Sequence, residues 1–214
     1  MPVIALLNLK GGVGKSTTAV HLAIWLHKQG KSIAFIDSDP QQTSSSWLNS
    51  LEIDFPVQPL LDPEELFETA NAWTNVFNYV VVDGPGSLSE QTKTILDCSD
   101  LVLIPCQPSG PDLQSSGKIL QIIKHKQMTR QGKPKALLFL NRAIRGTLLL
   151  RDSEQALAKN PNFPLLKTVI YQRQLLADAN IQRGTAFSLS GKAAKDTATE
   201  YEQLFLEVLA NYRN

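Results

Sequence analysis

Few folds accommodate the glycine-rich stretch near the start of this chain, Leu9-Lys10-Gly11-Gly12-Val13-Gly14-Lys15-Ser16-Thr17. It follows a short apolar run, residues 3–7, and precedes an amphipathic run, residues 18–29, so the predicted order is strand, turn, helix. Glycines lack the Cβ that would keep backbone N–H groups away from an anion. A helix that begins after such a turn adds its unpaired N–H groups and its positive dipole end to the same site. The stretch therefore predicts a loop that binds a polyphosphate.

Two side chains of this loop have chemistry suited to a nucleotide. Lys15 supplies a mobile point charge for the outer phosphates, and the hydroxyl of Ser16 suits a Mg²⁺ ligand. The predicted nucleotide-binding residues are Gly11, Gly12, Val13, Gly14, Lys15, Ser16 and Thr17.

The loop departs from the ordinary phosphate-loop pattern, G-x-x-x-x-G-K-[ST], because Leu9 stands in place of the first glycine and a second lysine, Lys10, follows it. The variant K-G-G-x-G-K-[ST] resembles the deviant Walker A box of the ParA/MinD family of dimeric ATPases. In that family the first lysine reaches across the dimer to the partner's nucleotide, so the resemblance implies that role for Lys10. The alternative, a glycine-rich surface turn with two chance lysines, is disfavoured by the flanking strand and helix.

An acidic segment follows the next apolar run. Residues 32–36 predict a short strand that ends in Asp37-Ser38-Asp39-Pro40-Gln41. A carboxylate at the end of a parallel strand beside the phosphate loop can hold a Mg²⁺ water, and a second carboxylate two residues on can orient an attacking water. The segment resembles the family's switch I box, which implies that Asp37 belongs to the Mg²⁺ shell and that Asp39 is required for hydrolysis. The alternative is a pair of acidic turn residues before Pro40.

Consecutive β-branched residues in Tyr79-Val80-Val81-Val82-Asp83 predict a buried strand that ends in a carboxylate. This is the arrangement of a Walker B strand, in which Asp83 should hold the Mg²⁺ through water. Residues 84–87 resemble switch II, and this resemblance implies that the amide of Gly84 senses a terminal phosphate. Loop, acidic switch, Walker B strand and second switch together indicate nucleotide binding.

Two further segments resemble the family near its nucleotide. A strand predicted over residues 135–140 ends in Asn141, and an asparagine at this strand end reads the adenine edge in the family. The alternative is a turn residue that closes the strand. The stretch that contains Arg173, Ala177 and Gly184 resembles the family's "R…A…G" segment.

Composition is that of an ordinary globular chain, with 43% hydrophobic and 19% charged residues. No stretch approaches the roughly 18 uninterrupted apolar residues of a membrane span, and no basic region with a cleavage site stands before the first strand, so we expect neither a membrane span nor secretion. Cys98 and Cys106 lack partners at metal spacing and are expected as reduced thiols, and His21 and His27 are expected as packing or surface residues. We expect a single ATPase domain over residues 1–214 in the cytoplasm.

The net charge of +1 conceals an asymmetry. Residues 1–112 carry 5 Lys and Arg against 13 Asp and Glu, whereas residues 113–214 carry 16 against 7. Either the second half contributes a face that binds a polyanion, or its cations are scattered over solvated helices. The candidate contacts to DNA are Arg145, Arg151, Arg173, Arg183, Lys192 and Lys195.

The last predicted helix, residues 192–212, separates relatives within the family. Its apolar stripe is Tyr201, Leu204, Phe205, Val208, Leu209 and Tyr212, and its polar side carries Glu200, Glu202 and Glu207. A membrane-surface helix would need Lys and Arg there, so we expect no membrane-targeting tail of the MinD kind. We also expect no extra domain before the first strand, and so not one of the larger, operator-binding ParA proteins.

Alternating strands and helices, with ligand motifs at the carboxyl ends of strands, predict an α/β fold: a doubly wound, mostly parallel sheet flanked by helices, as in P-loop NTPases. Further helices are predicted over residues 43–51 (capped by a serine at 44 to 46), 63–76 (capped by Asp62), 89–98, 112–130 and 147–159, and further strands over residues 57–61, 100–105 and 165–170.

The resemblance is strongest to small ParA proteins, which act in plasmid partition (ParF-like) or carboxysome positioning (McdA-like). It implies a Mg²⁺-dependent ATPase that forms a homodimer on ATP and binds nonspecific double-stranded DNA of the nucleoid. A ParB/ParG-like or McdB-like adaptor would stimulate slow hydrolysis and so release the protein.

Two other classes share the scaffold. A metabolic P-loop enzyme of the dethiobiotin-synthetase type would not need Lys10 as a contact across a dimer. An electron-transfer protein like the nitrogenase iron protein would bridge a cluster between subunits, but Cys98 and Cys106 are close in sequence and lack the glycine-rich setting of such ligands.

Overall fold

The structure, a computed structural model, describes residues 2–213, except for the side chains of residues 111–115. A seven-stranded sheet runs through the molecule in the order β3-β2-β4-β1-β5-β6-β7, and each pair of neighbouring strands is parallel. The strands are β1 Val3–Leu6, β2 Ile33–Asp37, β3 Val57–Pro59, β4 Tyr79–Asp83, β5 Leu101–Cys106, β6 Lys135–Ala143 and β7 Leu165–Tyr171. The predicted parallel α/β fold is confirmed.

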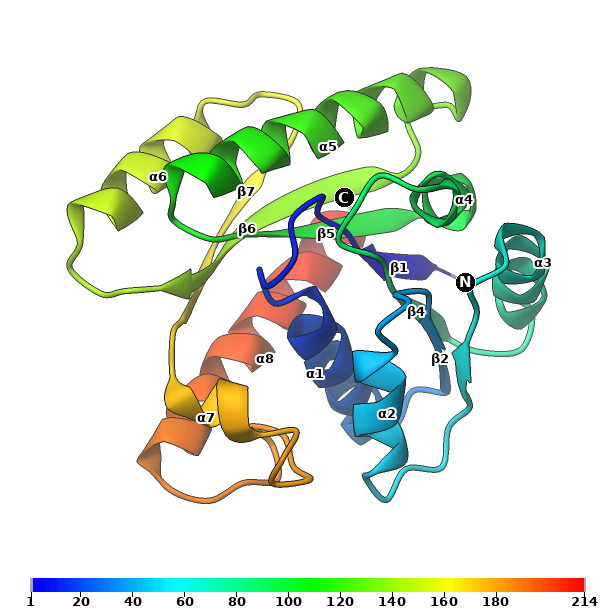
Figure 1. Ribbon diagram of the computed structural model, residues 1–214, viewed down its shortest axis with the longest axis horizontal. Coiled ribbons are helices and arrows are strands. Elements are labelled where there is room, and N and C mark those ends of the chain that lie inside the picture. Colours follow the sequence, from blue (N-terminus) through cyan, green and yellow to red (C-terminus); the bar gives the residue numbers. More distant parts are fainter. Residues whose placement is uncertain (1, 214) are drawn as a thin grey trace.

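Helices cover both faces of this sheet (Figure 1). The core on one face contains side chains of α1, α2 and α8, and the core on the other contains side chains of α3, α4, α5 and α6. The helices are α1 Lys15–Lys28, α2 Thr43–Asn49, α3 Pro63–Trp73, α4 Glu90–Cys98, α5 Gly110–Thr129, α6 Leu148–Ala158, α7 Gln174–Asp178 and α8 Lys192–Arg213. The doubly wound arrangement therefore buries both faces of the sheet.

The central strands form a rigid base for the loops that follow them. Every residue of β1, β2 and β5 is buried, as is every residue of β4 except Tyr79. Such continuous apolar runs are what a parallel strand with helices on both faces requires. Their register pairs Asp83 with Leu6 on one side and with Asp37 on the other. The ends of β1, β2 and β4 therefore lie level at the carboxyl edge of the sheet.

Two helix starts were predicted with different success. Asp62 caps α3 as predicted, because its Oδ1 accepts the N–H groups of Glu64 and Glu65 at 3.0 and 2.9 Å. The predicted serine cap of the helix that begins at Thr43 is wrong. There the cap comes from outside the helix, since Asp37 Oδ2 accepts the N–H of Ser45 at 2.8 Å.

The C-terminal helix α8 buries the predicted apolar stripe, with Tyr201, Leu204, Phe205 and Val208 fully inaccessible. Its predicted polar side is wrong at two positions. Glu207 accepts the N–H groups of Lys167 and Thr168 at 2.7 and 3.0 Å and so fixes β7, and Glu200 is buried among arginines. In the part of the chain that the structure describes, neither α8 nor any other helix has the length and apolarity needed to cross a membrane.

His21 joins α1 to α8 and to the loop before it. Its ring stacks on Tyr201 at 4.4 Å between centroids, and its Nε2 accepts the N–H of Ala186 at 3.1 Å. Because Nε2 is the acceptor, the proton lies on Nδ1, which donates to the carbonyl of Thr17 at 2.7 Å. Complete burial lowers the pKa of His21 from 6.5 to about 4. The expected packing role of this histidine is confirmed.

We expect this burial to make stability depend on pH. In the unfolded chain His21 takes up a proton near pH 6.5, whereas in the folded chain it does so only near pH 4, so its contribution is complete above pH 6.5 and is lost as the pH falls towards 4. At about 1.4 kcal/mol for each pKa unit, the loss is about 3 kcal/mol. Urea denaturation at pH 4 to 7.5 should show a flatter pH profile for His21→Gln than for the wild type. Identical profiles would contradict this origin of the pH dependence.

Candidate nucleotide-binding site

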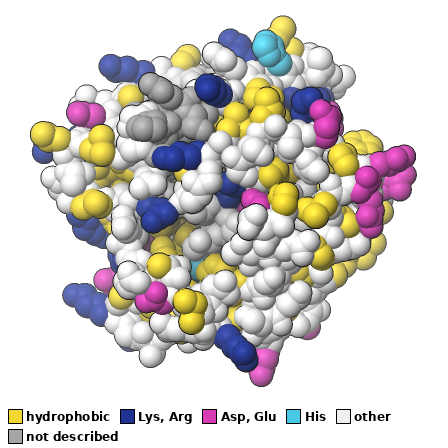
Figure 2. Space-filling model, in the orientation of Figure 1, with side chains coloured by type: hydrophobic (Ala, Val, Ile, Leu, Met, Phe, Trp, Pro, Cys, Tyr) yellow, Lys and Arg dark blue, Asp and Glu magenta, His cyan; other side chains and the backbone are white. Residues whose placement is uncertain are grey.

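A cavity of about 510 Å³ opens at the carboxyl edge of the sheet. Figure 2 shows the corresponding hollow near the middle of this face, with basic side chains around it. The lining residues are Gly11, Gly12, Gly14, Lys15, Ser16, Thr17, Asp39, Gln41, Thr43, Asn141, Arg142, Gln172, Arg173, Gln174, Leu176, Ala177 and Tyr201. The structure therefore brings the predicted loop, Asp39 and Asn141 to one cavity. Five predicted site residues are outside this lining: Lys10, Val13, Asp37, Asp83 and Gly84.

The phosphate loop is shaped as an anion site. Gly14 directly precedes α1 with φ 93°, and a Cβ there would lie 2.3 Å from Nδ2 of Asn141, so only glycine fits. Gly14 has no side chain that could cap α1, so the first N–H groups of this helix are left for a ligand at its N-terminal end. Lys15 is 5% exposed, and its ammonium donates to the carbonyl of Lys10 at 3.3 Å. Burial lowers the pKa of Lys15, while the charges of Asp83 and Asp39 raise it.

Asp83 lies fully buried at the end of β4, and neither of its oxygens has a hydrogen-bond partner among the described residues. Burial raises the pKa of Asp83 to about 7. The hydroxyl of Ser16 opposes this rise, as do Ser44 and Lys15, whereas the charge of Asp37 adds to it. An unpaired buried carboxylate is costly unless a cation or donor completes it. Next to the Ser16 hydroxyl, this carboxylate fits a Mg²⁺ site.

The two carboxylates of the predicted switch I segment, Asp37 and Asp39, already accept hydrogen bonds from backbone N–H groups. Asp37 accepts the N–H of Asp39 at 3.1 Å as well as that of Ser45, so both of its oxygens stabilise the turn after β2. Asp39 accepts the N–H of Gln41 at 2.9 Å and lies at the cavity wall. Its role in hydrolysis and that of Asp37 in the Mg²⁺ shell stay predictions.

Within residues 2–213, apart from the side chains at 111–115, no three His, Cys, Asp or Glu side chains gather as a metal cluster. A cation here would therefore have few protein ligands and would need oxygens from phosphates and water. That sparse set is typical of Mg²⁺ at nucleotide sites.

The predicted role of the Gly84 amide is wrong. This amide donates to the carbonyl of Leu6 at 3.1 Å and so continues the pairing of β4 with β1. A Cβ on Gly84 would lie 2.3 Å from Cδ2 of Leu7, which explains the glycine by packing. The glycine that meets the phosphate loop is Gly86, where a Cβ would lie 3.3 Å from Gly11 Cα and 3.4 Å from Lys15 Nζ. The sequence shows two glycines in Gly84-Pro85-Gly86, but which of them meets the phosphate loop depends on how β4 pairs with β1.

Asn141 lies within β6 rather than in a turn that closes it. It is 2% exposed, and its Nδ2 donates to the carbonyl of Val13 at 2.7 Å. Its Oδ1 is buried without a described partner and is the atom left to meet a ligand. An acceptor at this point matches the exocyclic amine of adenine, and the contact with the base stays a prediction. Arg142, which the sequence reasoning did not single out, donates to the carbonyl of Gly12 at 2.5 Å.

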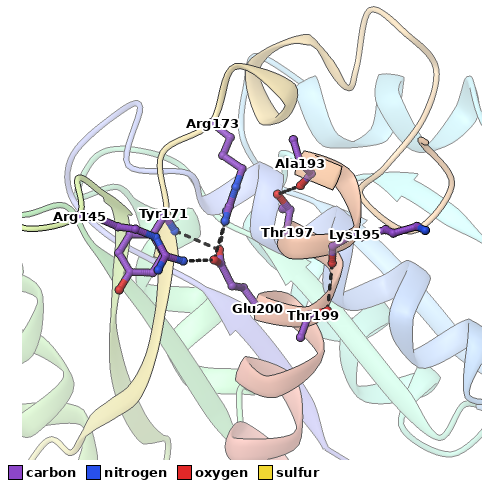
Figure 3. Close-up of polar contacts among 8 residues, drawn as sticks. All are labelled: Arg145, Tyr171, Arg173, Ala193, Lys195, Thr197, Thr199 and Glu200. Atoms are coloured by element: carbon purple, nitrogen blue, oxygen red, sulfur yellow. Dashed lines mark hydrogen bonds and ion pairs between the residues drawn. The ribbon is translucent and has the colours of Figure 1, made fainter. Parts of the chain in front are cut away.

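Beyond Arg142, the cavity wall is held by a buried carboxylate on α8 (Figure 3). Glu200 is 9% exposed and accepts hydrogen bonds from both terminal nitrogens of Arg173, at 2.5 and 2.6 Å. It also accepts one from Nη2 of Arg145 at 3.2 Å and one from the N–H of Tyr171 at 3.3 Å. The guanidinium of Arg145 also lies 3.8 Å from the centroid of the Tyr171 ring.

Arg173 is therefore a wall residue of the cavity whose charge is neutralised in place, and its predicted availability to DNA is wrong. Arg145 shares the same carboxylate but keeps a side chain that is 68% exposed. The other candidate DNA contacts are exposed, namely Arg151, Arg183, Lys192 and Lys195.

The chain matches a family model and a curated protein in sequence. The model of the CobQ/CobB/MinD/ParA nucleotide binding domain matches residues 4–185. The chain is 30% identical to Maintenance of carboxysome distribution protein A of Halothiobacillus neapolitanus, over 96% of this chain and 95% of that protein.

Two solved structures show the same fold. Apo McdA of Cyanothece superposes with a TM-score of 0.81 at 18% identity, over 97% of this chain and 99% of that one. A putative plasmid partition protein of Borrelia burgdorferi bound to AMPPNP superposes with a TM-score of 0.74 at 20% identity, over 98% and 99%.

The Glu200 cluster gives a prediction about stability. Removing this carboxylate by Glu200→Ala leaves Arg173, whose side chain is 15% exposed, without its counter-charge, and we expect a loss of about 3 kcal/mol in the free energy of unfolding. The matched control is Glu202→Ala on the exposed side of the same helix, expected within about 0.5 kcal/mol of the wild type. Chemical denaturation measures both. Equal effects of the two substitutions would show that the cluster does not hold the wall.

Proposed function

The chain belongs to the CobQ/CobB/MinD/ParA nucleotide-binding family, and we propose that it is a Mg²⁺-dependent ATPase that positions a cargo, either a plasmid or a carboxysome. The observation that carries the ATPase proposal is the buried carboxylate of Asp83, which has no hydrogen-bond partner in the described part of the chain and lies beside Ser16 and the glycine loop that follows β1. A Mg²⁺–nucleotide complex supplies what both groups need, a cation for the carboxylate and an anion for the loop. The sequence similarity to a carboxysome distribution protein supports the positioning role.

Each residue of the site has a defined task in this proposal. Ser16 and Asp83 would hold a Mg²⁺ ion, which would supply positive charge against the phosphates, with Asp37 supporting the site from the next strand. Lys15 straightens from the carbonyl of Lys10 towards the outer phosphates. Asp39, at the cavity wall, orients the water that attacks the terminal phosphate. Asn141 accepts a hydrogen bond from the adenine amine through Oδ1, which has no partner among the described residues.

Dimerisation is the second part of the proposal. Two copies bind face to face across their nucleotides, and Lys10 of each copy contacts the nucleotide of the other. A cation that arrives from the partner makes transition-state stabilisation depend on assembly. This dependence distinguishes the proposal from a metabolic enzyme of the dethiobiotin-synthetase type, for which Lys10 is dispensable.

DNA binding is the third part. The basic second half of the chain presents Arg151, Arg183, Lys192 and Lys195 at the surface, which supports backbone contacts to nonspecific double-stranded DNA. The dimer would reside on the nucleoid in the cytoplasm. A ParB/ParG-like or McdB-like adaptor on the cargo would stimulate slow hydrolysis and release it.

Hydrolysis and assembly are tested together with Asp39→Ala. We expect this variant to bind ATP, to release phosphate at least about 100-fold more slowly than the wild type because the water is no longer oriented, and to dimerise with ATP. Adding Lys10→Ala should prevent the dimer, whereas Lys31→Ala, an exposed lysine of the following turn, should not. Phosphate release and sedimentation velocity measure the two effects. An ATP-loaded Asp39→Ala protein that stays monomeric at high concentration would contradict the proposed dimer.

DNA binding is tested by its dependence on salt. Because each neutralised phosphate releases counterions, the affinity of the ATP-loaded Asp39→Ala protein for duplex DNA should fall on the order of 10³-fold between 50 and 200 mM salt. Arg183→Ala and Lys192→Ala should each make that dependence less steep, and Glu202→Gln should leave it unchanged. Fluorescence anisotropy with a labelled duplex measures this. Salt-independent binding, or none, would contradict the third part of the proposal.

A further inference from the structure

Two consecutive residues of β6 bind two consecutive carbonyls of the phosphate loop. Asn141 Nδ2 donates to the carbonyl of Val13 at 2.7 Å, and Arg142 Nη1 donates to the carbonyl of Gly12 at 2.5 Å. In a regular strand, neighbouring side chains point to opposite faces of the sheet. A regular β6 would therefore present only one of these two side chains to the loop.

The strand is irregular at this point. Leu140 pairs with Val169 and Ala143 with Tyr171, so three steps along β6 match two steps along β7. The additional residue makes a β-bulge, a feature that redirects side chains. Within it Arg142 has φ 54°, in the left-handed region. The bulge is thus the backbone change that allows both side chains to reach the same loop.

The backbone itself does not favour arginine here. A left-handed φ strains any residue with a Cβ, and glycine would adopt it without that strain. Packing does not require arginine either, because the Arg142 residue is exposed and lines the cavity. Neither the backbone nor packing therefore explains an arginine at this position, and the contact that requires its guanidinium is the one with the Gly12 carbonyl.

The contact with Gly12 has a direct consequence for the loop. In a trans peptide unit the C=O and the following N–H lie in one plane and point in opposite directions. Fixing the carbonyl of Gly12 therefore fixes the direction of the N–H of Val13, and fixing the carbonyl of Val13 fixes that of Gly14. N–H groups of this loop are the donors proposed to bind phosphate.

We propose that Arg142 is a positioning residue: through the bulge in β6 it holds the Gly12 carbonyl and so sets the phosphate loop for nucleotide before nucleotide arrives. This role rests on the proposed function, because it assigns the loop to a nucleotide. A loop that is already ordered loses less conformational freedom on binding, and its affinity is correspondingly higher.

The test separates backbone strain from loop positioning. Arg142→Gly relieves the left-handed strain, so its thermal midpoint should equal or exceed that of the wild type by up to about 3 °C. The same variant should bind Mg²⁺–AMPPNP about tenfold more weakly, as expected when one positioning hydrogen bond is lost. The matched control is Gln131→Gly, at φ 53° after α5, which should show the same thermal effect with AMPPNP affinity within about twofold of the wild type. A role in folding alone would not lower affinity while stability is kept.

Two further variants extend the test. Asn tolerates the left-handed region but is too short to replace the guanidinium, so Arg142→Asn should reproduce the loss of affinity even if Arg142→Gly folds poorly. Arg142→Lys keeps a long donor and should recover affinity to within about threefold of the wild type.

Hydrogen exchange of residues 10–16 in nucleotide-free protein gives a readout that needs no ligand. It should be faster in Arg142→Gly and unchanged in Gln131→Gly. Two results would overturn the positioning role alone. One is that Arg142→Gly and Arg142→Asn bind AMPPNP as tightly as the wild type, and the other is that these two variants and the wild type exchange equally fast. Wild-type protein that does not bind AMPPNP overturns the proposed function, and the role of Arg142 with it.

Discussion

The candidate site depends on the buried carboxyl group of Asp83, which has no hydrogen-bond partner among the described residues. Asp83 ends the buried strand β4, where a carboxylate is strongly disfavoured, and its backbone pairs with Leu6 of β1 and Asp37 of β2. Burial raises its pKa to about 7. The surrounding groups are the ones that a bound cation and a polyphosphate would complete: the Ser16 hydroxyl, the Lys15 ammonium and the uncapped start of α1. In the proposed function, a bound Mg²⁺–nucleotide would complete the charges and donors that the fold leaves unpaired here.

Distant parts of the chain hold the walls around this charge. His21 ties the first turns of α1 to α8 through Tyr201, and Glu200, the neighbour of Tyr201, fixes Arg173 after β7. On the other side, Asn141 and Arg142 hold the phosphate loop from β6. The C-terminal helix therefore contributes to the geometry of a site whose proposed phosphate-binding residues lie at the opposite end of the sequence.

The sequence predicted those features that depend on local patterns. Strand, glycine turn and helix follow one another around Lys15, and consecutive β-branched residues lead into Asp83, so both could be read from short stretches. Other features depend on pairing between distant segments. Whether Gly84 or Gly86 meets the loop depends on the register of β4 with β1. The burial of Glu200 depends on Arg145 and Arg173, which follow β6 and β7, and the reach of Arg142 depends on a bulge opposite β7. A charge pattern alone made Glu200 a surface residue and Arg173 a DNA contact, and the ion pair between them corrects both.

The most direct measurement of the central claim is a crystal structure of this chain with Mg²⁺ and AMPPNP. The account predicts that the phosphates lie against the N–H groups of residues 11–16 and that a Mg²⁺ ion lies about 2.1 Å from the Ser16 hydroxyl, with Asp83 bound to one of its waters. A nucleotide bound elsewhere, or one bound at the loop while Asp83 stays without a partner, would contradict it.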